Sequence, residues 1–167
     1  MDDALFSARE KLNMPTPLKR DCGKICGARC CRSCEGEETG MLLFPGEDTL
    51  YREKEGWHIR KTAAGLMVIC PGSCAREERP LACRLFPLLP VIREGKIRAA
   101  TDLRAKAVCP LARQGIRAVD PAFADAVRNA GRILAADEKQ RRFLEILTAE
   151  QDELRQLRDR LGGINHV

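Results

Sequence analysis

Residues 22–34, CGKICGARCCRSC, place five of the nine cysteines of this chain within one short stretch. The remaining four lie between residues 70 and 109, and no cysteine follows residue 109. An odd number of thiols cannot pair completely as disulfides, and a chain of 167 residues can bury a core without such cross-links. We therefore expect the sulfur to bind metal, and we expect this metal to shape the cysteine-bearing part of the fold.

The spacing of the cysteines suits metal binding. Three residues separate Cys22 from Cys26 and Cys26 from Cys30, and the same interval separates Cys70 from Cys74. Closely spaced cysteines in a loop can turn their thiolates toward one ion at little cost in loop-closure entropy. The alternative is that the later cysteines are ordinary buried thiols, because free cysteine is among the most buried residue types.

Cys30 and Cys31 are adjacent, which carries further information. Neighbouring side chains usually point in different directions and seldom bind one ion together, so the pair favours two metal centres or one multinuclear centre. Eight cysteines would supply two four-sulfur sites and leave Cys34 over. The predicted metal ligands are Cys22, Cys26, Cys30, Cys31, Cys70, Cys74, Cys83 and Cys109.

Cysteine ligands alone do not identify which metal is bound. Cys70 and Cys109 each precede a proline, which holds the cysteine extended and turns the chain away after it. A Cys-Pro pair ends the common bacterial iron–sulfur run, and it also occurs in structural zinc sites. The expected cofactor is therefore Zn²⁺ or an iron–sulfur cluster of the [4Fe–4S] type.

Composition restricts the function classes. The first residues, MDDALFSAREKLNMP, contain no apolar run of signal-peptide length, so we expect a cytoplasmic protein. No stretch approaches the roughly 20 apolar residues of a membrane span, and we expect no membrane partner. The net charge of +5 comes from bases interleaved with acids, without an aromatic platform, so we expect no nucleic acid. The cationic surplus fits the counter-charge of anionic thiolate sites.

Two segments predict short antiparallel hairpins. WHIRK and LMVIC, within residues 57–70, flank a TAAG turn, and LLPVIR and KIRAAT, within residues 88–101, flank Glu94-Gly95. The Gly, Cys and charged residues between 20 and 40 predict loop punctuated by turns.

Helical patterns occur at both ends of the chain. Residues 3–12 have helical spacing, and Asp120 with Pro121 is a typical helix start. A second long helix is predicted from Asp137 to the Gly162-Gly163 stop. The expected fold is α+β and mainly helical, with cysteine-rich metal-binding loops, two short β-hairpins and two C-terminal helices. We divide it into a cysteine-cluster domain, 1–113, and a C-terminal helical segment, 114–167.

The last helix carries one apolar stripe: Phe143, Leu147, Leu154, Leu157 and Leu161. This stripe is expected to pack on the cysteine domain or on the preceding helix. The alternative is a protein partner or a homodimer formed through the same stripe, because a helix of this length can reach beyond a small domain.

The order of the cysteine segments resembles a known family. CGKICGARCC, then CPGSCAREERPLACRLFP, then CPLAR is similar to the YkgJ-type cysteine-cluster family, described as a zinc- or iron-chelating domain, over residues 20–113. Two departures are an extra residue between Gly27 and the cysteine pair and the lack of the usual Tyr before Arg79-Pro80. The resemblance implies metal binding in a structural or redox role. Through the related flagellin lysine N-methylase it also implies an alternative, a metal-dependent group-transfer enzyme or oxidoreductase.

Arg79 and Arg84 are candidate second-layer residues of the cofactor site. Cations near thiolates stabilise the anionic site and tune the thiolate pKa, although either arginine could be an ordinary ion-pair partner. The motifs of zinc hydrolases and of phosphate-binding loops are absent, and His58 is expected to be a half-buried strand residue and not a ligand. Whether the protein is an enzyme is left open by the sequence.

Overall fold

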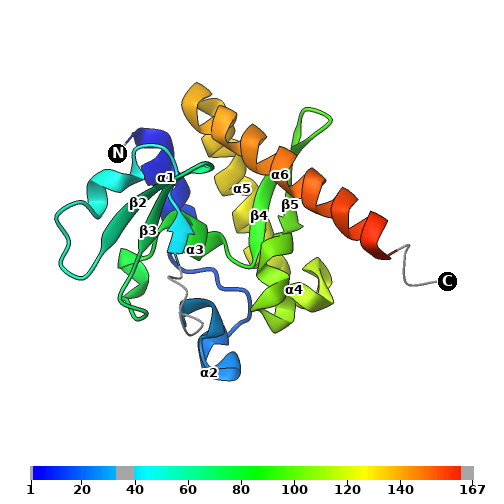
Figure 1. Ribbon diagram of the computed structural model, residues 1–167, viewed down its shortest axis with the longest axis horizontal. Helices are drawn as coiled ribbons and strands as arrows, with labels where there is room; N and C mark the ends of the chain where they lie inside the picture. Colours follow the sequence, from blue (N-terminus) through cyan, green and yellow to red (C-terminus); the bar gives the residue numbers. More distant parts are fainter. Residues whose placement is uncertain (1, 33–39, 163–167) are drawn as a thin grey trace.

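The computed structural model describes residues 2–32 and 40–162 (Figure 1). Helical residues make up 54% of the structure and strand residues 16%, which confirms the predicted mainly helical α+β class. The α-helices are α1 (Asp3–Lys11), α2 (Cys22–Cys26), α3 (Leu81–Leu85), α4 (Pro110–Gln114), α5 (Pro121–Ala136) and α6 (Glu138–Gly162). The strands are β1 (Gly40–Leu42), β2 (His58–Thr62), β3 (Gly65–Ile69), β4 (Leu88–Arg93) and β5 (Lys96–Thr101). The 3₁₀ helices are η1 (Arg29–Cys31), η2 (Glu47–Leu50), η3 (Arg76–Glu78), η4 (Leu103–Ala107) and η5 (Ile116–Ala118).

The strands form two separate antiparallel sheets, and both predicted hairpins are confirmed. β2 pairs with β3, and β1 adds to the other edge of β3 as a third strand. β4 pairs with β5 and closes at Glu94-Gly95, where both residues have positive φ angles of 52° and 70°. A two-residue turn with both φ angles positive matches the twist of a hairpin. The strand β1 was not predicted, because three residues give no periodic pattern.

One hydrophobic core joins α1, the β4–β5 sheet and the two long C-terminal helices. Leu5 of α1 and Leu12 at the C-cap of this helix are fully buried in it, as are Phe123 and Leu134 of α5. Figure 1 shows α5 and α6 crossing the β4–β5 pair. The core therefore contains residues from both sides of the predicted boundary at residue 113.

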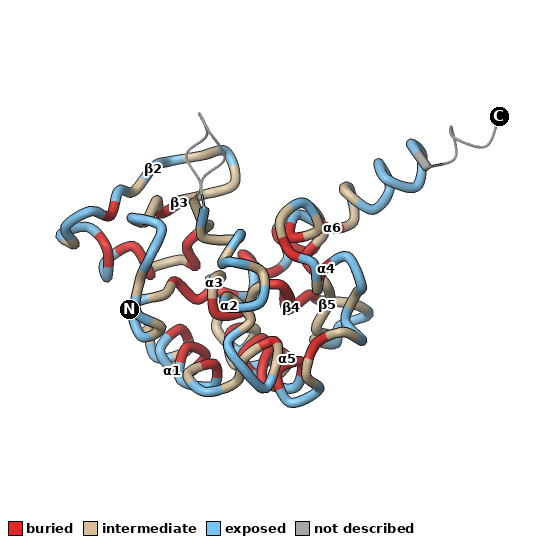
Figure 2. Tube along the Cα trace, turned by 90° about the horizontal axis from the view of Figure 1, so that it is seen from below, coloured by how far each residue is buried: buried red, intermediate tan, exposed pale blue. Residues whose placement is uncertain are grey.

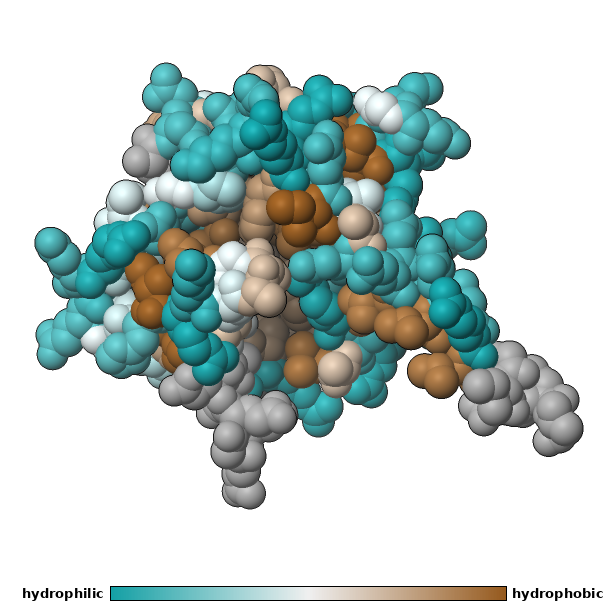
Figure 3. Space-filling model, turned by 45° about the horizontal axis from the view of Figure 1, so that its top comes forward, coloured by the Kyte–Doolittle hydropathy of each residue, from teal (hydrophilic) through white to brown (hydrophobic). Residues whose placement is uncertain are grey.

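The first half of α6 packs against the body of the protein, and the last turns project from it (Figure 2). The Phe143 ring meets Phe44 edge-on at 5.1 Å between centroids, and Leu147 is buried. Leu157 and Leu161 are 51% and 63% exposed, and Figure 3 shows apolar atoms on these last turns. Association through this exposed part stays a prediction. Within the described residues no helix is both long and apolar enough to span a bilayer.

The prediction of loop over residues 20–40 is wrong in part, because α2 and η1 form there. The Asp21 side chain accepts a hydrogen bond from the Gly23 N–H at 2.9 Å and caps the start of α2. Gly27, with a φ of 65°, ends the helix in the left-handed conformation that glycine favours. Neither α2 nor η1 contains a buried residue, so apolar packing contributes little to their position.

A buried ion pair joins α1 to η2. An Nη1 hydrogen of Arg9 is donated to Oε1 of Glu47, whose side chain has no exposed surface. The same carboxylate accepts the backbone N–H of Leu81 at 2.7 Å and of Phe44 at 3.2 Å. Burial raises the pKa of Glu47, and the Arg9 charge opposes this rise. Glu47 therefore connects three segments that are distant in sequence: α1, the β1–η2 link and α3.

Gly131 of α5 marks a close approach between a helix and a sheet. A Cβ atom at this position would lie 2.5 Å from Cβ of Pro90 and 2.7 Å from Cγ2 of Ile97. Gly131→Ala is expected to destabilise the fold by about 1–3 kcal/mol through overpacking, although alanine favours a helix more than glycine does. Urea denaturation measures the change, with Asn129→Ala at an exposed position of the same helix as control. A Gly131→Ala variant as stable as the parent would contradict the close packing.

Candidate metal centre

Eight of the nine cysteines lie in the described part of the chain, and all eight are free thiols. Cys34 and His166 fall outside the described residues. The eight thiols come from α2 and η1, from the loop after β3, from α3 and from the start of α4. Their mutual proximities divide them into two groups. The α2 group is Cys22, Cys26, Cys30 and Cys109; the α3 group is Cys31, Cys70, Cys74 and Cys83.

The α2 group gathers where α2 meets the start of α4. Burial raises the pKa of Cys22, and the neighbouring charges of Cys26, Asp21 and Cys109 raise it further. Cys30 also lies within electrostatic reach of Cys22 and Cys26. Cys109 is the N-cap residue of α4 and packs in a small apolar cluster between η4 and α4. Residues distant in sequence thus meet here.

The α3 group gathers beside the three-stranded sheet. Burial raises the pKa of Cys83 well above its ordinary value, and the charges of the other three members of the group add to this rise. Cys70 and Cys74 pack against the apolar cluster that contains Trp57 and Val68. This cluster belongs to the sheet and differs from the one that contacts the α2 group.

The two groups touch at Cys30 and Cys31, whose Sγ atoms lie 3.9 Å apart. The hydrogen bond between the two sulfur atoms raises the pKa of Cys30 and lowers the pKa of Cys31. The loop that carries Cys70 and Cys74 lies against η1 at this point. At Gly72, which has a φ of 80°, an added Cβ atom would lie 3.3 Å from the Cys31 carbonyl oxygen. Both the conformation and the close approach favour glycine.

Arg79 is a cation that faces the thiols. Its side chain donates a hydrogen bond to Cys74, and its positive charge acts to lower the pKa of Cys74, Cys31 and Cys22. The charge of Arg79 therefore reaches members of both groups. Its Nε atom is buried and has no hydrogen-bond partner among the described residues. A buried donor without a partner, next to thiols, fits a neighbouring anionic group.

Arg84 differs from Arg79 in its partners. Its Nε donates to the carbonyl oxygen of Arg79 at 3.1 Å, and its other nitrogens donate to the carbonyls of Arg9 and Glu77 and to the Asn13 side chain. These bonds place Arg84 in the packing between α1 and α3 and hold the backbone of Arg79. A direct role of Arg84 at sulfur stays a prediction.

The donor set fits a thiophilic metal. Cysteine thiolates bind Zn²⁺ at about 2.3 Å, and four cysteines hold a cubane iron–sulfur cluster. Among the residues that the structure describes, no three Cys, His, Asp or Glu side chains are already arranged around one ion. Cysteine side chains move between three staggered χ1 rotamers, so ligation would require the thiols of a group to turn inward.

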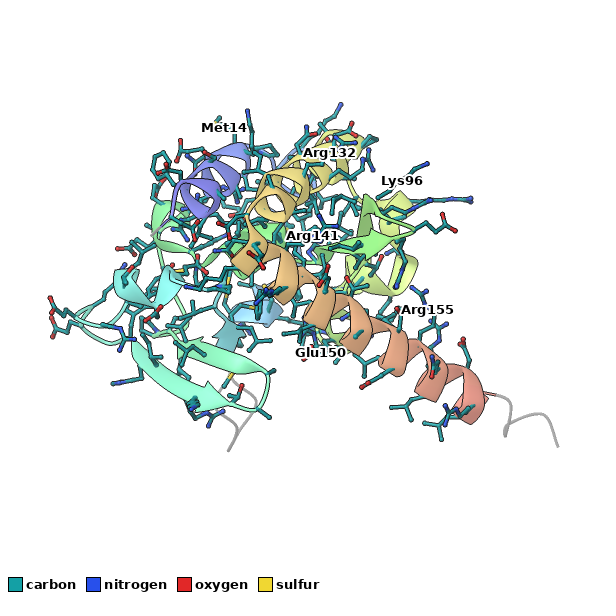
Figure 4. All side chains as sticks on the ribbon, turned by 90° about the horizontal axis from the view of Figure 1, so that it is seen from above. Met14, Lys96, Arg132, Arg141, Glu150 and Arg155 are labelled. Atoms are coloured by element: carbon teal, nitrogen blue, oxygen red, sulfur yellow. The ribbon has the colours of Figure 1, made fainter. Side chains whose placement is uncertain are left out.

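Asp102, His58 and a surface hollow on the β4–β5 hairpin are polar features outside the two cysteine groups. Asp102 accepts hydrogen bonds from the backbone N–H of Arg104 and from Gln151, so it is a helix cap. His58 lies in β2 as expected, but it is exposed and not half-buried, because β2 is an edge strand of its sheet. A hollow of about 500 Å³ on the β4–β5 hairpin is lined in part by Lys96 and Arg132 (Figure 4). It contains no cysteine and lies on elements that carry none of the eight thiols.

Comparisons of this chain with protein-family models, with curated proteins and with solved structures find no match. The resemblance to the YkgJ-type family therefore stays an expectation from the cysteine motifs.

Proposed function

We propose that this protein binds zinc or an iron–sulfur cluster through eight cysteine thiolates, as two centres, in a structural or redox role. The observation that carries the proposal is the proximity of free thiols from distant segments, four of which lie within electrostatic reach of one arginine, Arg79: Cys22, Cys31, Cys74 and Cys83. Isolated buried thiols do not require such a meeting, because each could be buried alone in the apolar core.

The surroundings of the thiols support ligation over disulfide pairing. Arg79 supplies a positive charge and a buried, unpartnered N–H beside them. Of the segments that carry the ligands, α2 and η1 bury no residue, as expected where a bound ion supplies the missing stabilisation. Four thiolates per centre would leave no ligand position open, which favours a structural or redox role over a substrate-binding one.

Anaerobic purification with quantification of zinc, iron and acid-labile sulfide per chain tests the proposal. We expect either colourless protein that contains zinc or brown protein that contains iron and sulfide. Cys34→Ala is the matched control, because Cys34 is the cysteine predicted to be no ligand, and its metal content should equal that of the parent. A folded, metal-free parent with every thiol open to a thiol reagent would overturn the proposal.

Arg79→Gln is expected to weaken metal binding by about 10- to 100-fold, the usual effect of losing a residue that supports metal ligands. The variant loses the positive charge that stabilises nearby thiolates. Competition with a chromophoric chelator measures the affinity. Arg79→Lys should lose less because it keeps the charge, and the exposed Arg117→Gln should lose nothing. Equal affinities for Arg79→Gln and Arg117→Gln would count against the role of Arg79.

A further inference from the structure

We infer that the two centres have separate ligand sets: the α2 group binds one centre, the α3 group binds the other, and the adjacent Cys30 and Cys31 serve different centres. This inference rests on the proposed function and deepens it, because it assigns each of the eight thiols to a site. Each set would take one thiophilic ion, or one cluster, in a four-sulfur environment.

The positions of the elements that carry the thiols support this division into two ligand sets. The α2 group lies on α2, on η1 and at the start of α4, and its Cys109 packs with the apolar residues of η4 and α4. The α3 group lies on η1, in the loop after β3 and on α3, and its Cys70 and Cys74 pack with a different apolar cluster, formed by Leu43, Tyr51, Trp57 and the β3 residue Val68. The two groups therefore lie against different apolar surfaces. Among the described elements, only η1 contributes a thiol to both groups.

The geometry of η1 explains how it can serve two sites. In a 3₁₀ helix successive residues are rotated by about 120°, so adjacent side chains leave the axis in different directions. Besides each other, Cys30 has Cys22 and Cys26 within electrostatic reach, whereas Cys31 has Cys83 and Cys74. Gly72 lies close to the Cys31 carbonyl oxygen, so the loop that carries Cys70 and Cys74 lies beside Cys31.

Alternative assignments fit less well. The 3.9 Å between the Sγ atoms of Cys30 and Cys31 would also suit two ligands of one ion. The remaining thiol neighbours of the two residues separate them, because Cys22 and Cys26 lie near Cys30, whereas Cys74 and Cys83 lie near Cys31. Cys109, at the start of α4, lies near Cys22, whereas the other set is supplied by η1, by the loop after β3 and by α3. Each group thus contains one ligand from a distant segment that closes the set.

Zinc content of alanine variants, prepared anaerobically and loaded with Zn²⁺, tests the division. Cys30→Ala and Cys31→Ala should each lose about half of the bound zinc. A second substitution in the same group, Cys30→Ala with Cys109→Ala or Cys31→Ala with Cys83→Ala, should lose no more than the single variant. Cys30→Ala with Cys31→Ala should lose all of it. Far-UV circular dichroism identifies variants that fail to fold, and Cys26→Ala and Cys74→Ala then replace the affected member.

Trp57, the single tryptophan of the chain, gives a second readout. It packs in the cluster that contacts Cys70 and Cys74, so its fluorescence should change when Cys31→Ala empties the α3 group and should stay as in the parent for Cys30→Ala. If the parent binds zinc but Cys30→Ala and Cys31→Ala together lose only what either loses alone, the division is wrong while metal binding stands. A parent without metal overturns both.

Discussion

Removal of the metal from the loaded protein is expected to free residues 22–31 and 70–78 while α5 and α6 stay folded. Neither α2 nor η1 nor η3 buries a residue, so these segments have little apolar packing to hold them. Structural zinc supplies about 10–16 kcal/mol of binding free energy in small domains, and this energy is lost with the ion. In contrast, α5 has seven buried residues, Phe123, Ala124, Ala126, Val127, Ala130, Gly131 and Leu134, and keeps its core.

Amide hydrogen exchange of loaded and chelator-treated protein measures this effect. We expect protection to fall by at least about 100-fold in the two cysteine segments, since each 1.4 kcal/mol of lost local stability is tenfold in exchange. The amides of α5 serve as the internal control and should change little. Equal loss of protection in α5 would show that the metal supports the whole fold, and unchanged loops would show that it supports none of it.

Glu47→Gln is expected to destabilise the protein by about 3–5 kcal/mol, the usual cost of removing one partner from a buried ion pair. Arg9 would keep its charge at a site where only 8% of its side chain is exposed, without the carboxylate that balances it. The free energy of unfolding, from urea denaturation followed by circular dichroism, gives the change.

The matched control is Glu145→Gln, which removes a carboxylate from an ion pair with Arg141 that is about half exposed on both sides. Exposed pairs contribute about 0–1 kcal/mol, so little change is expected there. Arg9→Met combined with Glu47→Leu should recover part of the loss, because it leaves no unpaired buried charge. A Glu47→Gln variant as stable as the Glu145→Gln control would mean that Arg9 has another way to balance its charge.

The sequence predicted the elements that have a strong local signal. Helix α5 begins at Asp120 and Pro121 as expected, because the cap and the proline act within one turn. The β4–β5 hairpin closes at Glu94-Gly95, because the turn residues set its register. Short elements such as α2, α3 and β1 were missed, since three to five residues carry too little periodicity and their capping is local.

For the candidate site, the sequence indicated which residues would come together but could not show how they divide. Spacing groups Cys22, Cys26 and Cys30, yet nothing in it places Cys109 with them, because that proximity depends on the packing of α4. The same limit applies to Arg84, which is next to Cys83 in sequence but donates its hydrogen bonds to oxygen atoms of α1 and of the η3 segment. Residues that are adjacent in sequence can therefore have different partners and different roles.

The adjacency of Cys30 and Cys31 has a consequence for electrons. If Cys30 and Cys31 each held an iron–sulfur cluster, the covalent path between the clusters would consist of the two cysteine side chains and the one peptide unit that joins them. The Sγ atoms of the two cysteines lie 3.9 Å apart. At such separation in a partly buried site, a charge added to one cluster would raise the energy of adding a second charge to its neighbour. The reduction potentials of the pair would then belong to both clusters jointly, and the first electron would enter more easily than the second.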